Sequence, residues 1–132
     1  AVHNEQLACE LYIDCLATGS EHAISRIDST LILYEGCIEE LSYRIADDPD
    51  YQVLKNEKAM FEFLVDILYD LKTKAQNGEY DYKTILNKLE CVENYFNLKH
   101  NTYNLEYVLS EDIFDEYAQR YAAGEDIESI LG

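Results

Sequence analysis

Apolar residues recur along most of the chain at spacings of three and four positions, the period of an amphipathic α-helix. The clearest pattern follows Ser20, a residue type that caps helices. It places apolar side chains at Ile24, Ile27, Leu31, Tyr34, Ile38, Leu41 and Ile45. Successive spacings of 3, 4, 3, 4, 3 and 4 form an unbroken heptad seam, which predicts one long helix. The seam is buried either against other helices of the same chain or in a homodimeric coiled coil.

A second long helix follows after a short acidic turn, Asp47-Asp48-Pro49-Asp50. Asp48 suits an N-cap and Pro49 suits the first helical position, so we predict that the helix begins there. It continues to Asn77-Gly78, a C-terminal signal. Between Met60 and Leu71 it is apolar on most faces, which is typical of a central, buried helix. The two helices, each about 40 Å long, should form an antiparallel hairpin.

Shorter helical patterns lie on both sides of this hairpin. One runs from Asn4 to Thr18, another follows Asp81, a third follows the capping residue Ser110, and a last turn follows Gly124. Their apolar positions are Ala8, Leu11, Tyr12 and Cys15; Ile85, Leu89, Val92 and Phe96; Phe114, Tyr117, Ala118 and Tyr121; and Ile127, Ile130 and Leu131. We therefore predict an all-α fold, a bundle of about five helices built on the long hairpin.

The composition fits a single domain over residues 1–132. Residues 103–132 are acidic and pack either with the rest or less tightly. One Pro and five Gly are too few for a many-stranded β fold. The sequence contains no apolar run long enough for a membrane span and no secretory signal. Its cysteines, Cys9, Cys15, Cys37 and Cys91, form no C-x-x-C pair and fall on helical patterns. Buried thiols in a reducing, cytoplasmic compartment are the expectation, and no zinc site is predicted.

The charge is strongly negative and unevenly distributed. Ten basic and 27 acidic residues give a net charge of −17, which argues against direct binding to nucleic acid or an anionic membrane. Residues 1–52 hold 11 acids and two Arg, residues 53–100 hold eight acids and seven Lys, and residues 101–132 hold eight acids and one Arg. The two ends of the chain therefore carry nearly all of the excess.

Two acidic segments are candidates for binding a basic partner. The first interleaves carboxylates with aromatic residues and includes Glu106, Tyr107, Glu111, Asp112, Asp115 and Glu116. Carboxylates attract a basic surface while tyrosine rings supply buried contacts. The second is the turn with Asp47, Asp48 and Asp50. The alternative explanation is that the aromatic residues pack the bundle, the acids maintain solubility, and capping accounts for the turn.

A stripe of carboxylates, Glu62, Asp66 and Asp70, offers a second candidate site. Completed by Glu35 and Glu39, it could bind a divalent metal, so Glu35, Glu39, Glu62 and Asp66 form the alternative metal site. Such a site is similar in kind to that of the all-helical, magnesium-dependent nucleotide pyrophosphatases of the MazG type. Those enzymes carry paired E-E-x-x-E and E-x-x-D motifs, whereas this chain has Glu-x-x-x-Glu followed by Glu-x-x-x-Asp. Lys58 and Lys74 extend the stripe at both ends, which favours a solvated, salt-bridged helix face.

The sequence contains no recognisable nucleophile motif, phosphate loop or metalloprotease signature. We therefore expect a non-enzymatic protein, a monomer or homodimer without a cofactor, that binds a basic partner such as a nuclease or another nucleic-acid-binding complex. It would inhibit or regulate that partner by imitating the charge of nucleic acid, as phage inhibitors and immunity proteins do. A metal-dependent nucleotide hydrolase is the alternative function. A structural subunit of a helical assembly is the third, and it predicts an exposed apolar patch.

Overall fold

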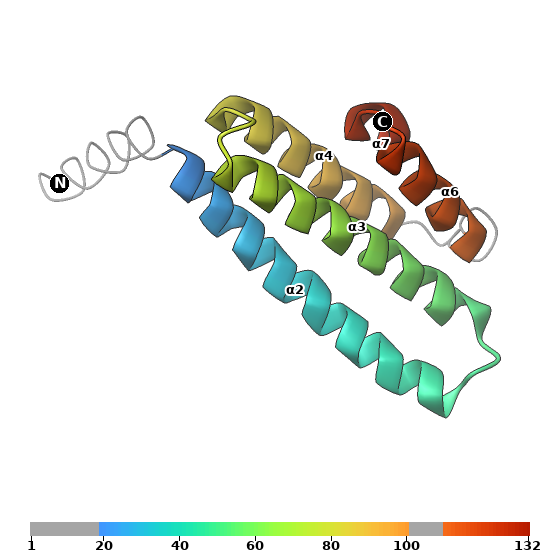
Figure 1. Ribbon diagram of the computed structural model, residues 1–132. Helices are drawn as coiled ribbons and strands as arrows, with labels where there is room; N and C mark the ends of the chain where they lie inside the picture. The colour runs from blue at the N-terminus through green and yellow to red at the C-terminus, as the bar shows by residue number, and fades with distance from the viewer. Residues whose placement is uncertain (1–18, 101–109) are drawn as a thin grey trace, which may run out of the picture.

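The computed structural model describes residues 19–100 and 110–132 (Figure 1). Within these ranges every regular element is a helix, which confirms the predicted all-α bundle. The elements are α2 (Gly19–Asp47), α3 (Gln52–Gln76), α4 (Tyr82–His100), α6 (Glu111–Ala122) and α7 (Ile127–Leu131). The helix predicted over Asn4–Thr18 and the candidate residues Glu106 and Tyr107 lie outside the described residues.

The predicted hairpin is the framework of the bundle. Helices α2 and α3 run antiparallel and lie side by side over most of their length (Figure 1). The heptad seam of α2 faces the core, because Ile27, Leu31, Tyr34 and Leu41 are all at most 4% exposed. The seam is therefore buried within the chain, and a homodimeric coiled coil is not needed to cover it.

Helix α3 is the central helix, as its apolar composition predicted. It packs against α2, α4 and α6. Met60, Leu64, Ile67, Leu68 and Leu71 are at most 1% exposed. Aromatic rings connect α3 to its neighbours on two sides. The ring centroids of Tyr34 on α2, Phe61 on α3 and Phe96 on α4 lie 5.1–5.4 Å apart. Phe63 lies 6.2 Å from Phe114 and 5.8 Å from Tyr117, which attaches α6 to α3.

The start of α3 differs from the prediction. Asp48 is not its N-cap: the helix begins at Gln52, with Tyr51 in the capping position. The backbone N–H of Tyr51 donates to the carbonyl of Asp48 at 3.2 Å, which closes a tight turn with Pro49 in its second position. Proline's fixed φ suits that position of a β-turn as well as it suits the first residue of a helix. In the structure Pro49 lies in this turn. Asp47 is the last residue of α2, and Asp48 and Asp50 lie in the connection between the helices.

The start of α2 also differs from the prediction, because α2 includes Gly19 and Ser20 lies within its first turn instead of capping it. Three other predicted signals are confirmed. Asn77 and Gly78 end α3, and Gly78 takes a φ of +72°, a value that glycine adopts without strain. Asp81 caps α4 by accepting a hydrogen bond of 2.8 Å from the backbone N–H of Thr84. Gly124, at φ +99°, turns the chain from α6 into α7.

The C-terminal helices α6 and α7 dock onto α3 and α4. Helix α6 packs against α3, and α7 packs against α4. Phe114, Ile127 and Ile130 are buried, whereas Ala118, predicted to lie in the core, is exposed because α6 is covered along one side only. None of the described helices is long and apolar enough to cross a lipid bilayer.

Candidate protein-binding surface

The two predicted acidic segments meet at one end of the bundle. The first turn of α6 lies beside the first turn of α3, next to the connection between α2 and α3 (Figure 1). The side-chain amide of Gln52 links them, because it donates to the Glu111 carboxylate at 3.4 Å and to the Asn56 amide oxygen at 2.9 Å. Asn56 is itself only 2% exposed, so the link is anchored in the core. We call this end of the bundle the acidic end.

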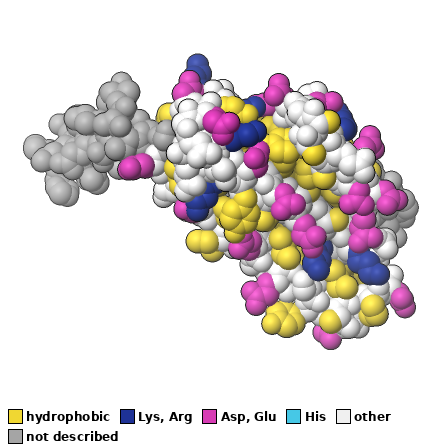
Figure 2. Space-filling model, in the orientation of Figure 1, with side chains coloured by type: hydrophobic (Ala, Val, Ile, Leu, Met, Phe, Trp, Pro, Cys, Tyr) yellow, Lys and Arg dark blue, Asp and Glu magenta, His cyan; other side chains and the backbone are white. Residues whose placement is uncertain are grey.

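The acidic end consists of seven carboxylates, all on exposed residues. They belong to Asp47 at the end of α2, to Asp48 and Asp50 in the connection, and to Glu111, Asp112, Asp115 and Glu116 on α6. The only basic residue in the segments 44–52 and 110–116 is Arg44. Figure 2 shows acidic side chains gathered over α6 and the neighbouring stretch of the hairpin. The two segments are therefore strongly negative, and the lysines nearest to them in the structure, Lys55 and Lys58, line a groove with Glu111.

The core orients the carboxylates of α6. Phe114 and Tyr117 occupy its inner side, with their rings edge to face at a centroid distance of 5.8 Å. The acids consequently point outward in two rows, Glu111 with Asp115 and Asp112 with Glu116. Members of a row are about 6 Å apart along the helix axis. Acids in the first turn stabilise a helix N-terminus, which accounts for Glu111 and Asp112 but leaves Asp115 and Glu116 without a structural role.

A groove borders the acidic end. It has a volume of about 440 Å³ and is lined by Ile45, Lys55, Lys58, Ala59, Glu62 and Glu111. Lys58 pairs with Glu62 at 3.6 Å. The negative surface therefore ends at a mixed-charge edge along α3, and a partner would meet both signs of charge there.

The residues of the alternative metal site are not brought together. Among the described residues, no three His, Cys, Asp or Glu side chains are placed to hold a metal ion. Glu35 instead accepts a hydrogen bond from the Tyr69 hydroxyl, and Asp70 pairs with Lys74 at 3.2 Å. Glu62 and Asp66 are exposed on the outer face of α3. Glu62 and Asp66 therefore lie on a solvated face, as Lys58 and Lys74 suggested. Asp70 is partly buried and also accepts a hydrogen bond from the Tyr121 hydroxyl of α6.

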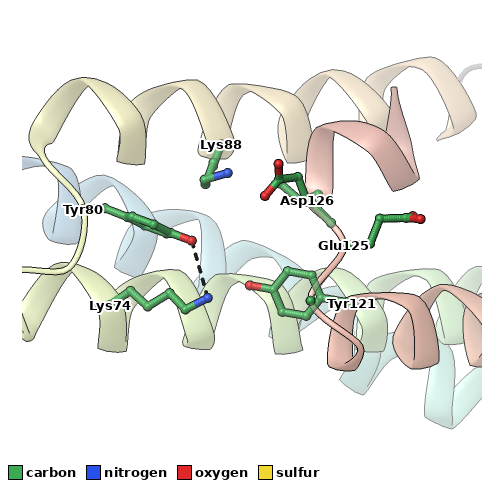
Figure 3. Close-up of a pocket in the computed structure, with 8 residues that line it drawn as sticks. Lys74, Tyr80, Lys88, Tyr121, Glu125 and Asp126 are labelled. Atoms are coloured by element: carbon green, nitrogen blue, oxygen red, sulfur yellow. Dashed lines mark hydrogen bonds between the residues drawn. The ribbon is translucent and has the colours of Figure 1, made fainter.

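A small polar pocket between α3, α4 and the α6–α7 turn was not predicted (Figure 3). Its volume of about 70 Å³ is far below the few hundred Å³ of a typical ligand site. Lys74 lies between the Tyr80 hydroxyl, at 3.5 Å, and the Tyr121 ring, at 5.6 Å from its centroid. On the opposite wall, Lys88 pairs with Glu128 at 3.0 Å. The residues come from separate helices, so no sequence spacing could have indicated them.

The groups in this pocket are paired with one another. The Tyr121 hydroxyl donates a hydrogen bond to Asp70, which also binds Lys74. Burial opposes the charge on Lys74, but the hydrogen bond to Asp70 and the nearby tyrosine oxygens raise the pKa of its ammonium above the ordinary value. Burial, and then the bond to Asp70, also raise the pKa of Tyr121. The pocket is therefore a polar joint that holds α6 on the bundle.

The two described cysteines, Cys37 on α2 and Cys91 on α4, are free thiols. Both are partly exposed rather than buried as predicted. Burial raises the pKa of each thiol, and carboxylates raise it further: Glu40 and Glu57 beside Cys37, and Glu128 beside Cys91. Thiols with a raised pKa are poor nucleophiles near neutral pH.

In comparisons with known proteins, no family model, curated protein or solved structure matches this chain.

Proposed function

We propose that this protein is a non-enzymatic binding protein that uses its acidic end to inhibit or regulate a basic protein partner. One observation carries the proposal: segments far apart in the sequence, around Asp48 and around Asp112, supply seven exposed carboxylates to one end of a rigid bundle. Nothing in the core requires the acids of the connection or those of the second turn of α6.

The physical basis is electrostatic complementarity. A dense negative surface speeds the encounter with a positively charged partner and disfavours acidic ones. The rings of Phe63, Phe114 and Tyr117 hold α6 in place, so its two rows of carboxylates lose little freedom on binding. Rows of negative charge on a rigid support suit a channel that binds nucleic acid, and imitation of nucleic acid is the form of inhibition we propose.

Three features support the non-enzymatic part of the proposal. The carboxylates of the alternative metal site stay apart, the pocket in Figure 3 is small and internally paired, and the described thiols have raised pKa values. The partner's chemistry follows from the surface: a basic protein, and in particular one that handles DNA or RNA.

Three variants with the same change in net charge test the proposal. The first, Asp47→Asn/Asp48→Asn/Asp50→Asn, neutralises the end of α2 and the connection. The second, Asp112→Asn/Asp115→Asn/Glu116→Gln, neutralises α6 and keeps Glu111 for its bond to Gln52. The matched control is Glu21→Gln/Glu79→Gln/Glu90→Gln, which removes three exposed carboxylates from other parts of the described surface.

Each protein would be immobilised and exposed to host-cell lysate, then eluted with rising salt or with excess duplex DNA. We expect a basic nucleic-acid-binding protein to be retained and to be released by both salt and DNA. Affinity for that protein, measured with the purified pair, should fall roughly ten-fold in both acidic-end variants and change little in the control. Retention that is indifferent to salt and DNA, or equal losses in all three variants, would contradict the proposal.

A further inference from the structure

The bundle has a second surface whose chemistry is different, an apolar groove between α2 and the C-terminal half of α4. Two hollows, of about 230 and 180 Å³, meet at the side chains of Leu33 and Phe96. The first is lined by Leu33, Cys37, Glu40, Leu41, Arg44, Glu57, Phe61 and Phe96, and the second by Thr30, Leu33, Tyr34, Glu93, Phe96 and Asn97. Because they share Leu33 and Phe96, the two hollows are adjacent along α2, and we treat them together as one groove.

A large apolar side chain is exposed at the centre of this groove. Leu33, which lines both hollows, is 59% exposed. An exposed leucine beside hollows lined by buried apolar residues suits a surface that binds an apolar partner. The floor is preformed, because Leu41 and Phe61 are held in the core at 4% and 1% exposure.

The shape of the groove suits a helix. It follows α2 from Thr30 to Arg44, a length of about 21 Å, which equals about four turns of a partner helix. On the outward side of α2, Gly36 is exposed, and a Cβ placed there would have no atom within 4 Å. A glycine inside a helix costs about 1 kcal/mol relative to alanine. No described neighbour uses the space that Gly36 leaves, and a helix lying against α2 could.

The charges along the groove select the occupant. Its lining carries the carboxylates of Glu40, Glu57 and Glu93 and one cation, Arg44. Glu93 is paired with Arg26 at 3.6 Å, so the excess negative charge of the groove lies at Glu40 and Glu57. Burial raises the pKa of the Cys37 thiol, and Glu40 and Glu57 raise it further, so their negative field reaches the groove floor. An occupant with basic residues beside its apolar side is therefore favoured.

Other occupants fit less well. A second copy of this chain, at a net charge of −17, would bring more carboxylates to the same rim. A helix over Asn4–Thr18 folded back from Gly19 would reach only about 22 Å, to the level of Leu33, where the groove still continues toward Arg44.

We propose that the α2–α4 groove, with Leu33 and Phe96 at its centre, is a docking site for an amphipathic helix that carries Lys or Arg beside its apolar face. The helix places apolar side chains on the groove floor and its cations on the side of Glu40 and Glu57. This site is separate from the acidic end and does not depend on the function proposed for it.

The test uses a fluorescent, helical probe peptide of about 15 residues, matched to the groove length. Leu occupies positions three and four apart on one face, and Lys flanks that face. One control peptide has Glu in place of every Lys, and another has Ser in place of every Leu. The full-length protein is titrated by fluorescence anisotropy as wild type, as Leu33→Arg, and as Tyr69→Arg. The last variant makes the same charge change at an exposed aromatic residue outside the groove.

We expect the Lys–Leu peptide to bind wild type and Tyr69→Arg alike, and to bind Leu33→Arg roughly ten-fold more weakly. Both control peptides should bind at least ten-fold more weakly than the Lys–Leu peptide. Amide NMR shifts on binding should concentrate at 30–44 and 93–98. The α6 variant that tests the acidic end should still bind the probe, so the two proposals can fail separately.

Several outcomes would overturn the inference. Equal binding of the Glu peptide, or undiminished binding to Leu33→Arg, would remove its chemical basis, as would NMR shifts confined to the acidic end. A dimer in light scattering that Leu33→Arg dissociates would assign the groove to a second copy. Contacts from residues 1–18 to Leu33 or Phe96 in the free protein would assign it to the chain's own N-terminal segment.

Discussion

Gln52 and Glu111 lie 59 positions apart in the sequence, and a 3.4 Å hydrogen bond from the Gln52 amide to the Glu111 carboxylate joins them. The contact brings the start of α6 to the start of α3, beside Asp47 at the end of α2 and Asp48 and Asp50 in the connection. Seven carboxylates therefore share one end of the bundle, where their mutual repulsion opposes folding. Stability and partner binding should consequently respond in opposite directions to changes there.

We expect neutralisation of the acidic end to stabilise the protein. Asp47→Asn/Asp48→Asn/Asp50→Asn should raise the urea midpoint, followed by circular dichroism, because it relieves repulsion with Glu111 and Asp112. Salt screens the same repulsion, so the gain should shrink when NaCl is added. The control Glu21→Gln/Glu79→Gln/Glu90→Gln should raise the urea midpoint by a smaller amount. A lower midpoint in the Asp variant would show that these aspartates stabilise the turn and are not held there for binding.

Buried tyrosines predict a loss of stability in alkali. Burial raises the pKa of Tyr34, Tyr95 and Tyr121 above the ordinary value of 10.0, and the bond to Asp70 adds to the effect at Tyr121. Their protonated forms are favoured by the fold, so this stability is complete below about pH 10 and is lost as the pH rises toward the folded-state values. The free energy of unfolding should therefore decline above pH 10.

Tyrosinate absorbance measures the same effect directly. Tyr34, Tyr95 and Tyr121 should ionise only together with the loss of helical signal. Tyr34→Phe should reduce the alkaline decline, and Tyr43→Phe, at a site 69% exposed in the wild type, should not. Ionisation of all tyrosines in one early step, with the fold intact, would contradict the packing of the three rings.

The N-cap of α4 predicts that the stability of the protein depends on pH in the acid range. Hydrogen bonds from the side chain and backbone of Thr84 hold the pKa of Asp81 below its ordinary value of 3.8. A carboxylate with a lowered folded-state pKa contributes its full stability above its ordinary pKa and loses it as the pH falls through the folded-state pKa. Asp81→Ala should thus lower the urea midpoint at pH 7, and the difference from wild type should begin to shrink near pH 3.8 and disappear as the pH falls through the lowered pKa of Asp81. Asp81→Ser, which can still cap the helix, should retain most of the midpoint and lose the pH dependence.

Local signals in the sequence predicted most of the fold. The heptad of α2, the apolar centre of α3 and the glycines at 78 and 124 act through neighbouring residues, and the structure confirms all of them. The start of α3 was predicted wrongly, because Pro49 fits a turn and a helix start equally well. Its local conformation depends on where Tyr51 and Gln52 must lie to meet the rest of the bundle.

Arrangements that join distant segments could not be predicted in the same way. The acids of the connection and of α6 were each recognised, but only the docking of Phe114 on Phe63 brings them to one end. The polar joint of Lys74, Tyr80 and Tyr121, and the groove at Leu33 and Phe96, likewise depend on how helices pack. The heptad separates the buried Leu31 from the exposed Leu33, but it does not show that Leu33 borders a groove with Phe96, because that depends on how α2 and α4 pack.

The centre of α3 should tolerate truncation least. Leu68 is 0% exposed, and Leu68→Ala leaves a cavity that the surrounding helices fill only in part. We expect the free energy of unfolding to fall by about 2–5 kcal/mol, measured by urea denaturation. Ile32→Ala, at a site 75% exposed, should change it by no more than about 0.5 kcal/mol. Similar losses in both variants would mean that Ile32 is buried in solution, either by another segment of the chain or by a second copy.

Divalent metal should have no specific effect on this protein. Glu35, Glu39, Glu62 and Asp66 are not placed to hold a metal ion, and Glu35 is hydrogen-bonded to Tyr69. The melting temperature in millimolar MgCl₂ should therefore match that in NaCl of equal ionic strength, and Glu62→Gln/Asp66→Asn should respond in the same way. Nucleoside triphosphates should remain intact when incubated with the protein and Mg²⁺. Stabilisation specific to Mg²⁺ that the double variant abolishes, accompanied by nucleotide hydrolysis, would instead show that the four carboxylates converge when metal binds.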